Sequence, residues 1–159
     1  MQNRMPSPLA PAAVVLIRIL VGWVFLSEGI QKFLFADALG VGRFTRIGIP
    51  APQVMAPFVG WVEIICGTLV LLGLLTRLAA CPLIVNMMVA LLSTKLPILL
   101  GHGYWLFSLP KVSRYGMWGA ASEARTDVSM LLGLLFLLIV GAGAWSLDAW
   151  LWPARVRRA

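Results

Sequence analysis

The sequence is short of charge, and above all of acidic residues. Only 12% of its 159 residues are charged, and six aspartates and glutamates stand against thirteen lysines and arginines. Hydrophobic residues make up 60% of the chain, and a soluble domain of this length has too little interior to bury them. The composition therefore excludes a soluble globular domain and predicts an integral membrane protein with one domain, residues 1–159.

Histidine and cysteine are scarce as well. His102 is the only histidine, so this chain alone cannot supply bis-histidine haem ligation, and no His/Cys spacing resembles a metal site. Cys66 and Cys81 lie in different apolar runs without a Cys-x-x-Cys pair. We interpret both as small buried hydrophobic residues rather than as a redox dithiol.

Long apolar runs are what the sequence has in abundance. Four of them, at about 12–35, 54–75, 78–100 and 128–151, come near the ~20 residues that a helix needs to cross the hydrocarbon core. Only internally satisfied helices fit such runs in lipid. We therefore predict an all-α fold, an integral membrane bundle of four transmembrane helices.

The segments between these runs indicate an orientation. Thr76 and Arg77 form a tight hairpin, residues 36–53 are rich in glycine and proline and should lie along the membrane interface, and residues 101–126 are rich in aromatics, which predicts a structured cap. Four spans place both termini on one side. The hairpin and the basic tail (Arg155, Arg157 and Arg158) favour the cytoplasm for that side, and lipid headgroups, rather than nucleic acid, explain the net charge of +7.

The first run carries charges that need partners. Arg18, Gly22, Phe25, Gly29 and Lys32 share one helix face, and that face cannot point at lipid, because charges there are costly.

Glu28 and Lys32 are four residues apart, so they can neutralise each other along the helix. Arg18 lies roughly 15 Å from Glu28 and needs another partner. Glu63, in the middle of the second run, is the candidate, and we predict an ion pair between Arg18 and Glu63 that joins the first two helices.

These residues and Asn86 form the predicted intramembrane polar network: Arg18, Glu28, Lys32, Glu63 and Asn86. The network is either a structural lock or a functional site. Glu28, Lys32 and His102 are the candidates for contact with a ligand or quinone, whereas we expect Asn86 to form an interhelical hydrogen bond. Asp127 should cap the N-terminus of the last helix.

Several motifs resemble the DoxX family of small bacterial membrane proteins, and together they cover nearly the whole chain. They are Arg18-x3-Gly22-x2-Phe25-x3-Gly29-x2-Lys32, Gly48-Ile49-Pro50-Ala51-Pro52, Glu63-x3-Gly67-x5-Gly73-x2-Thr76-Arg77, the Glu-Ala-Arg-Thr-Asp sequence at 123–127, and Gly141-x-Gly143-x2-Ser146-Leu147-Asp148. The resemblance implies a four-helix, multi-pass protein of the bacterial inner (plasma) membrane.

For function, the resemblance implies a membrane subunit or accessory component of a redox, quinone-linked assembly. It implies no intrinsic cofactor, quinone as the ligand, and the lipid bilayer, proteins of a redox complex or further copies of the chain as partners. The sequence holds no self-sufficient catalytic constellation, so any enzymatic role is that of a non-catalytic subunit. A small-solute or ion transporter or channel, and a purely structural envelope or assembly protein, remain the alternatives.

Overall fold

The computed structural model describes residues 10–151, and these are helical apart from turns and loops, with no strand among them beyond a single bridge between Tyr104 and Phe107. The helices are α1 (Ala10–Leu34), α2 (Val41–Ile47), α3 (Pro52–Leu72), α4 (Thr76–Ala90), the π-helix η1 (Leu91–Lys95), α5 (Leu96–Leu100), α6 (Met117–Val140) and α7 (Leu147–Leu151). The prediction of an all-α fold is confirmed. The basic tail lies outside the described residues.

Three of the predicted spans are confirmed as helices long and apolar enough to cross a membrane. They are Ala12–Leu34, Pro52–Leu72 and Thr76–Leu100. No other helix in the described part of the chain meets that criterion, so the count of four is not established.

The predicted fourth run, 128–151, does not form one helix. α6 begins earlier, at Met117, and ends at Val140, where Gly141 has φ +88° and leaves the helical conformation. A loop then leads into the separate short helix α7. Glu123, Arg125 and Asp127 therefore lie inside α6 rather than before it.

Glycines set the close packing of α1 on α3, which run antiparallel. A Cβ atom on Gly67 would lie 2.8 Å from the backbone nitrogen of Leu26, and one on Gly29 would lie 2.7 Å from the backbone oxygen of Gly60. Backbone approaches backbone here, so only glycine fits. This glycine-bearing face of α1, predicted to be turned away from lipid, thus packs on α3.

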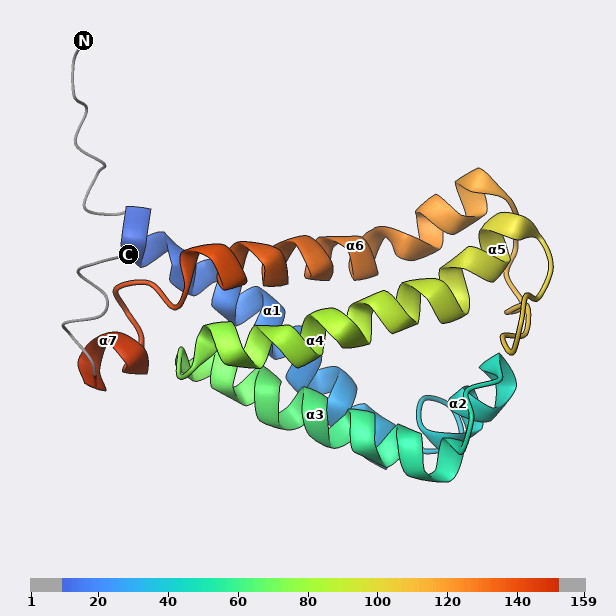
Figure 1. Cartoon of the computed structure of the whole chain (residues 1–159), viewed down its shortest axis with the longest axis horizontal. Coiled ribbons are helices and arrows are strands. Elements are labelled where there is room, and N and C mark those ends of the chain that lie inside the picture. The colour runs from blue at the N-terminus through green and yellow to red at the C-terminus, as the bar shows by residue number, and fades with distance from the viewer. Residues whose placement is uncertain (1–9, 152–159) are drawn as a thin grey trace, which may run out of the picture.

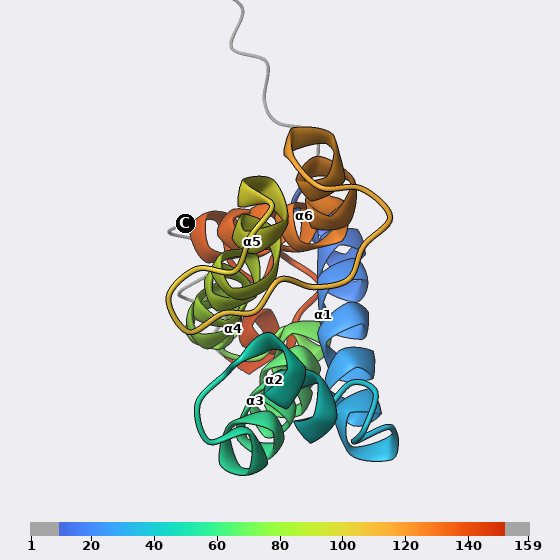
Figure 2. The same cartoon turned by 90° about the vertical axis from the view of Figure 1, so that its right-hand side faces the viewer.

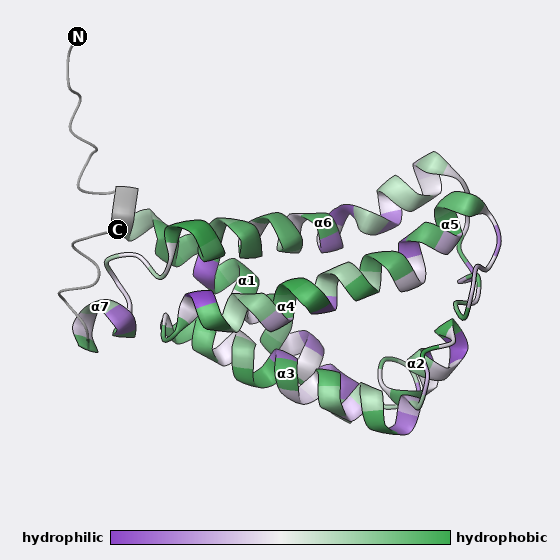
Figure 3. Cartoon of the chain, in the orientation of Figure 1, coloured by the Kyte–Doolittle hydropathy of each residue, from purple (hydrophilic) through white to green (hydrophobic). Residues whose placement is uncertain are grey.

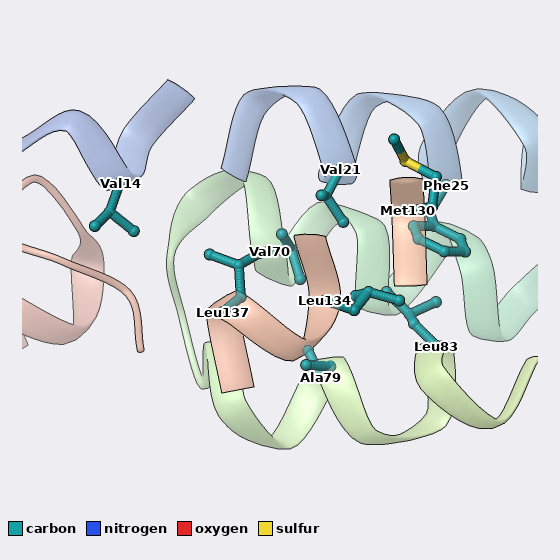
Figure 4. Close-up of a cluster of buried hydrophobic side chains, with 10 residues drawn as sticks. Val14, Val21, Phe25, Val70, Ala79, Leu83, Met130, Leu134 and Leu137 are labelled. Atoms are coloured by element: carbon teal, nitrogen blue, oxygen red, sulfur yellow. The ribbon is translucent and has the colours of Figure 1, made fainter. Parts of the chain in front are cut away.

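The hydrophobic core lies in the half of the bundle that contains the hairpin between α3 and α4. α1 contributes Val21 and Phe25, α3 contributes Val70, α4 contributes Leu83 and α6 contributes Leu134, and each is at most 1% exposed (Figure 4). From this half the helices spread apart, so the bundle is a wedge (Figures 1 and 2). Hydrophobic residues dominate the closed half, and hydrophilic ones interrupt α6 in the open half (Figure 3).

The two long connections meet at the open end of the wedge. α2 packs against α3 and buries Phe44. The loop before α6 is shorter than predicted, because α6 begins at Met117, and it is held to α2 by a hydrogen bond from the N–H of Ser108 to the carbonyl of Ile47 (3.1 Å). Trp105, on the same loop, is 87% exposed.

Candidate ligand cavity and polar clusters

Arg18 closes the narrow end of the wedge with backbone hydrogen bonds. Its guanidinium donates to the carbonyls of Val70 (3.1 Å) and Leu71 (2.7 Å) at the end of α3, and to those of Ala142 (3.0 Å) and Trp145 after α6. The last carbonyls of a helix have no donors within the helix and carry partial negative charge. Arg18 thereby joins α1 to the ends of α3 and α6 without an acidic partner within salt-bridge distance.

The predicted ion pair between Arg18 and Glu63 is wrong. Because α1 and α3 run antiparallel at close range, Arg18 lies beside the end of α3, beyond the reach of Glu63. A Cβ atom on Gly73 would lie 2.5 Å from the guanidinium carbon of Arg18. The glycine that ends α3 thus provides the space in which the guanidinium lies.

The residues of the C-terminal motif come to the same end of the bundle. The carboxylate of Asp148 accepts hydrogen bonds from the N–H groups of Leu75 (2.9 Å) and Thr76 (3.4 Å), where α4 begins. The N–H of Asp148 donates to the carbonyl of Gly73 (3.0 Å), and Arg77 donates to the carbonyl of Ile139 (2.8 Å). The end of the motif that runs from Glu63 to Arg77 and the motif from Gly141 to Asp148 are therefore parts of one architectural cluster.

A second polar cluster joins three helices in the middle of the bundle. The ammonium of Lys32 on α1 lies 2.6 Å from Glu63 Oε2 on α3, and the amide of Asn86 on α4 donates to Glu63 Oε1 (2.7 Å). Glu63 is 3% exposed. The predicted interhelical hydrogen bond of Asn86 is confirmed, and so is the pair of Glu28 with Lys32, although at 3.8 Å it is the longer of the two lysine contacts.

This cluster lies on the wall of a cavity of about 340 Å³. α1, α2, α3, α4, η1 and α6 all contribute to its lining, so the cavity occupies the space where the wedge begins to open. Its size falls in the lower part of the range for small-molecule sites. Most of the lining is apolar, including Phe25, Phe44, Val59 and Met130.

The cavity has a second ion pair, which the sequence does not predict. Lys95 on η1 and Asp127 on α6 lie 3.4 Å apart, and both line the cavity. Asp127 is not the N-terminal cap that we predicted, because α6 begins at Met117 and Asp127 lies in its interior. The only sign of this ion pair in the sequence is Lys95, a charged residue within an apolar run.

The π-helix that carries Lys95 follows from the sequence around it. Pro97 has no N–H to donate to the preceding turn and its ring crowds the carbonyl four residues earlier. The wider turn η1 precedes this proline, and the hydroxyl of Thr94 donates to the carbonyl of Ala90 (2.6 Å). Single π-turns inside α-helices are frequent at functional sites.

The third ligand candidate, His102, lies away from the cavity, whereas two charged residues that were not candidates line it. His102 is exposed, its Nδ1 lies 2.9 Å from the carbonyl of Gly103, and it is not among the residues that line the cavity. Arg43 on α2 and Glu123 on α6 do line it, and neither forms an ion pair with another described residue.

The cysteines lie on separate helices. Cys66, on α3, is half-buried, but Cys81, on α4, is exposed, which corrects the prediction that both are buried. No three His, Cys, Asp or Glu side chains gather as a metal site within residues 10–151.

The cavity has mostly apolar walls and two ion pairs in its lining. This combination suits a ligand that has a small polar group on an apolar body.

Comparison with known proteins gives a family and a relative. The model of the DoxX family matches residues 13–96. An uncharacterized membrane protein of Mycobacterium tuberculosis is 58% identical over 138 residues, which cover 87% of this chain and 80% of that protein. No solved structure matches the chain.

Proposed function

The chain belongs to the DoxX family of membrane proteins, and from that membership we propose that it is a membrane subunit or accessory component of a quinone-linked redox assembly. It holds the quinone headgroup in the cavity and leaves electron transfer to protein partners. The observation that carries this proposal is a ligand-sized cavity lined by two ion pairs inside a bundle of membrane helices.

The geometry of the cavity supports a headgroup with hydrogen-bond acceptors. An ammonium group has three donors, and Lys32 and Lys95 each share theirs with carboxylates only, Glu28 and Glu63 for the first and Asp127 for the second. Lys32 belongs to α1 and Lys95 to η1, so each leaves a donor for a quinone carbonyl from its own side of the cavity. The apolar side chains between them suit the ring.

A fourth crossing by α6 and an inner-membrane location belong to the same proposal. α5 ends at the open end of the wedge, whereas Asp148 on α7 bonds to Gly73 in the hairpin at the closed end. α6 is the element that connects these two ends, with an apolar stretch from Val128 to Val140. Both termini then lie on one side, for which we propose the cytoplasm, and lipid, redox partners or further copies of the chain surround the bundle.

The test is the quinone content of protein purified in mild detergent. We expect quinone in the solvent extract of the wild-type protein, and a large loss of it in Lys95→Met, which removes a donor in the cavity and leaves only the partly exposed Asp127 without its partner. Lys111→Met is the matched control, because Lys111 is exposed on the loop before α6 and does not line the cavity. Wild-type protein that carries no quinone and binds none when it is added would overturn the proposal, as would equal content in all three proteins.

Transport of a small solute or ion is the second candidate, and the charged lining of an intramembrane cavity favours it. Arg18 and its carbonyl partners close the narrow end, so a transport cycle has to open that cluster. Flux into proteoliposomes that disappears in Glu63→Gln, without quinone in the purified protein, would favour transport. If the protein contains no quinone and supports no flux, the structural role remains as the alternative.

A further inference from the structure

Part of the cavity lining that α3 and α4 contribute is apolar. Glu63 on α3 and Asn86 on α4 line the cavity where these two helices are joined. Beyond them, toward the open end, lies a group of four apolar lining residues, here named the portal: Met55 and Val59 on α3, and Met87 and Val89 on α4. A ligand in the cavity therefore meets charged groups at the two ion pairs and hydrocarbon at the portal.

The portal reaches the outer surface of the bundle. Met55 is 39% exposed and Val89 is 45% exposed, although both also line the cavity. The hydrogen bond between Asn86 and Glu63 joins α3 and α4 on the side nearer the hairpin, and beyond it the two helices diverge (Figure 1). α3 and α4 belong to candidate membrane spans, so we expect the surface outside the portal to face hydrocarbon.

We propose that the portal is the opening through which the apolar tail of a ligand extends from the cavity into the bilayer. The ligand class is then a membrane-resident amphipathic molecule with a small polar headgroup and a long hydrocarbon tail. This rests on the proposed function in one respect, that the cavity binds a headgroup.

The volume of the cavity agrees with a ligand whose headgroup lies inside it and whose tail lies outside. A volume of about 340 Å³ accommodates a ring-sized headgroup but not a long tail in addition. Lipid tails are as apolar as the side chains of the portal, so a tail can pass between them without leaving a hydrocarbon environment. A water-soluble solute would gain nothing from an opening of this composition.

The first experiment narrows the portal and compares two probes. Val89→Trp places a bulky ring in the portal, and Val85→Trp is the matched control, because Val85 is exposed one turn away on α4 and does not line the cavity. Affinities are measured for a benzoquinone with a decyl tail and for its tail-free counterpart.

We expect Val89→Trp to weaken binding of the decyl-tailed probe by about tenfold or more, a change of roughly 1.4 kcal/mol, and to leave the tail-free probe within about twofold. Val85→Trp should change neither affinity. Equal losses for both probes, or no loss for either, would show that the tail does not pass the portal. If the wild-type protein binds neither probe, the proposed quinone function fails.

The second experiment does not depend on quinone. Val59→Cys, in a background in which Cys66 and Cys81 are replaced by alanine, is labelled with bimane and reconstituted in vesicles. We expect quenching by phospholipids with spin-labelled acyl chains to exceed quenching by aqueous iodide. The reverse order would mean that the opening faces water, and it would refute the portal whatever the cavity binds.

Discussion

At the scale of single residues, the two cations of the first span, Arg18 and Lys32, play different roles, although both lie on one face of α1. Arg18 satisfies backbone carbonyls at the closed end, and Lys32 neutralises Glu63 at the cavity. A guanidinium donates in several directions from one plane, whereas an ammonium is a compact point charge. The residue types therefore match the partners that the structure gives them.

Arg18 should not tolerate lysine. Lysine keeps the charge but cannot reach the carbonyls of α3 and those after α6 together, so we expect Arg18→Lys to lower the free energy of unfolding by about 3 kcal/mol or more, given that hydrogen bonds to charged groups are worth ~1.5–3 kcal/mol each. Thermal unfolding in detergent measures this. Arg125→Lys is the control, since Arg125 is exposed and bonds only within α6. Equal stability of both variants would contradict the role assigned to Arg18.

The pair of Lys32 and Glu63 should show strong coupling. Removing one partner leaves a buried charge uncompensated, which costs roughly 3–5 kcal/mol. We expect Lys32→Met, which leaves Glu63 buried without a cation, to be destabilising by about this amount. Glu63→Leu should cost less, because Lys32 keeps its contact with Glu28. The double variant should be much less destabilised than the sum of the two. A double-mutant cycle on unfolding in detergent gives the coupling energy, and additive effects would refute the pairing.

The sequence was sufficient to predict the pair of Glu28 with Lys32, but not the partners of Arg18 or the base that pairs with Glu63. Glu63 does pair with a cation of the first span, as predicted, but that cation is Lys32 and not Arg18. Both cations lie on the glycine-bearing face of α1, so the sequence does not distinguish between them. Which of them reaches Glu63 depends on how far α1 is shifted along α3. That shift is set by backbone contacts, such as the one between Gly29 and Gly60, and the spacing of residues does not show it.

At the scale of secondary structure elements, the interface between α1 and α3 should be sensitive to a single methyl group. In Gly67→Ala the new Cβ would lie 2.8 Å from the backbone nitrogen of Leu26, so the helices have to separate, at a cost of about 1–3 kcal/mol. In Gly133→Ala the atom that the Cβ meets is a methyl group of Val21, at 2.7 Å, and a side chain can shift more easily than a backbone. We expect thermal unfolding to rank Gly67→Ala as the less stable variant, and the opposite order would contradict this packing.

Helix boundaries and the π-turn were the least predictable elements. Hydropathy sums locate apolar runs, and they predict α1, α3 and the helices from Thr76 to Leu100. They do not predict the first turns of α6, because a polar segment at 122–127 separates these turns from its apolar run. This error concealed the interior position of Asp127 and with it the ion pair to Lys95. The widened turn η1 depends on Pro97 and on the hydroxyl of Thr94 acting together, which no hydropathy sum registers.

At the scale of the whole molecule, composition was enough for the class of protein and insufficient for its shape. An all-helical chain with long apolar runs follows from the absence of water in the bilayer core. The wedge does not follow, because it depends on where α2 and the loop before α6 hold the helices apart, and the hydrogen bond between Ser108 and Ile47 joins segments distant in sequence. The cavity is a consequence of this shape.

The crossing of α6 and the orientation of the bundle can be measured together by labelling single cysteines in a background without Cys66 and Cys81. Lys111→Cys lies on the exposed loop before α6, and Ala144→Cys lies on the exposed loop after it. With four spans and cytoplasmic termini, a membrane-impermeant maleimide should label Lys111→Cys in intact cells, and Ala144→Cys only after the cells are permeabilised. The reverse pattern would retain the four crossings and invert the orientation. Labelling of both positions from the same side would mean that α6 does not cross the membrane.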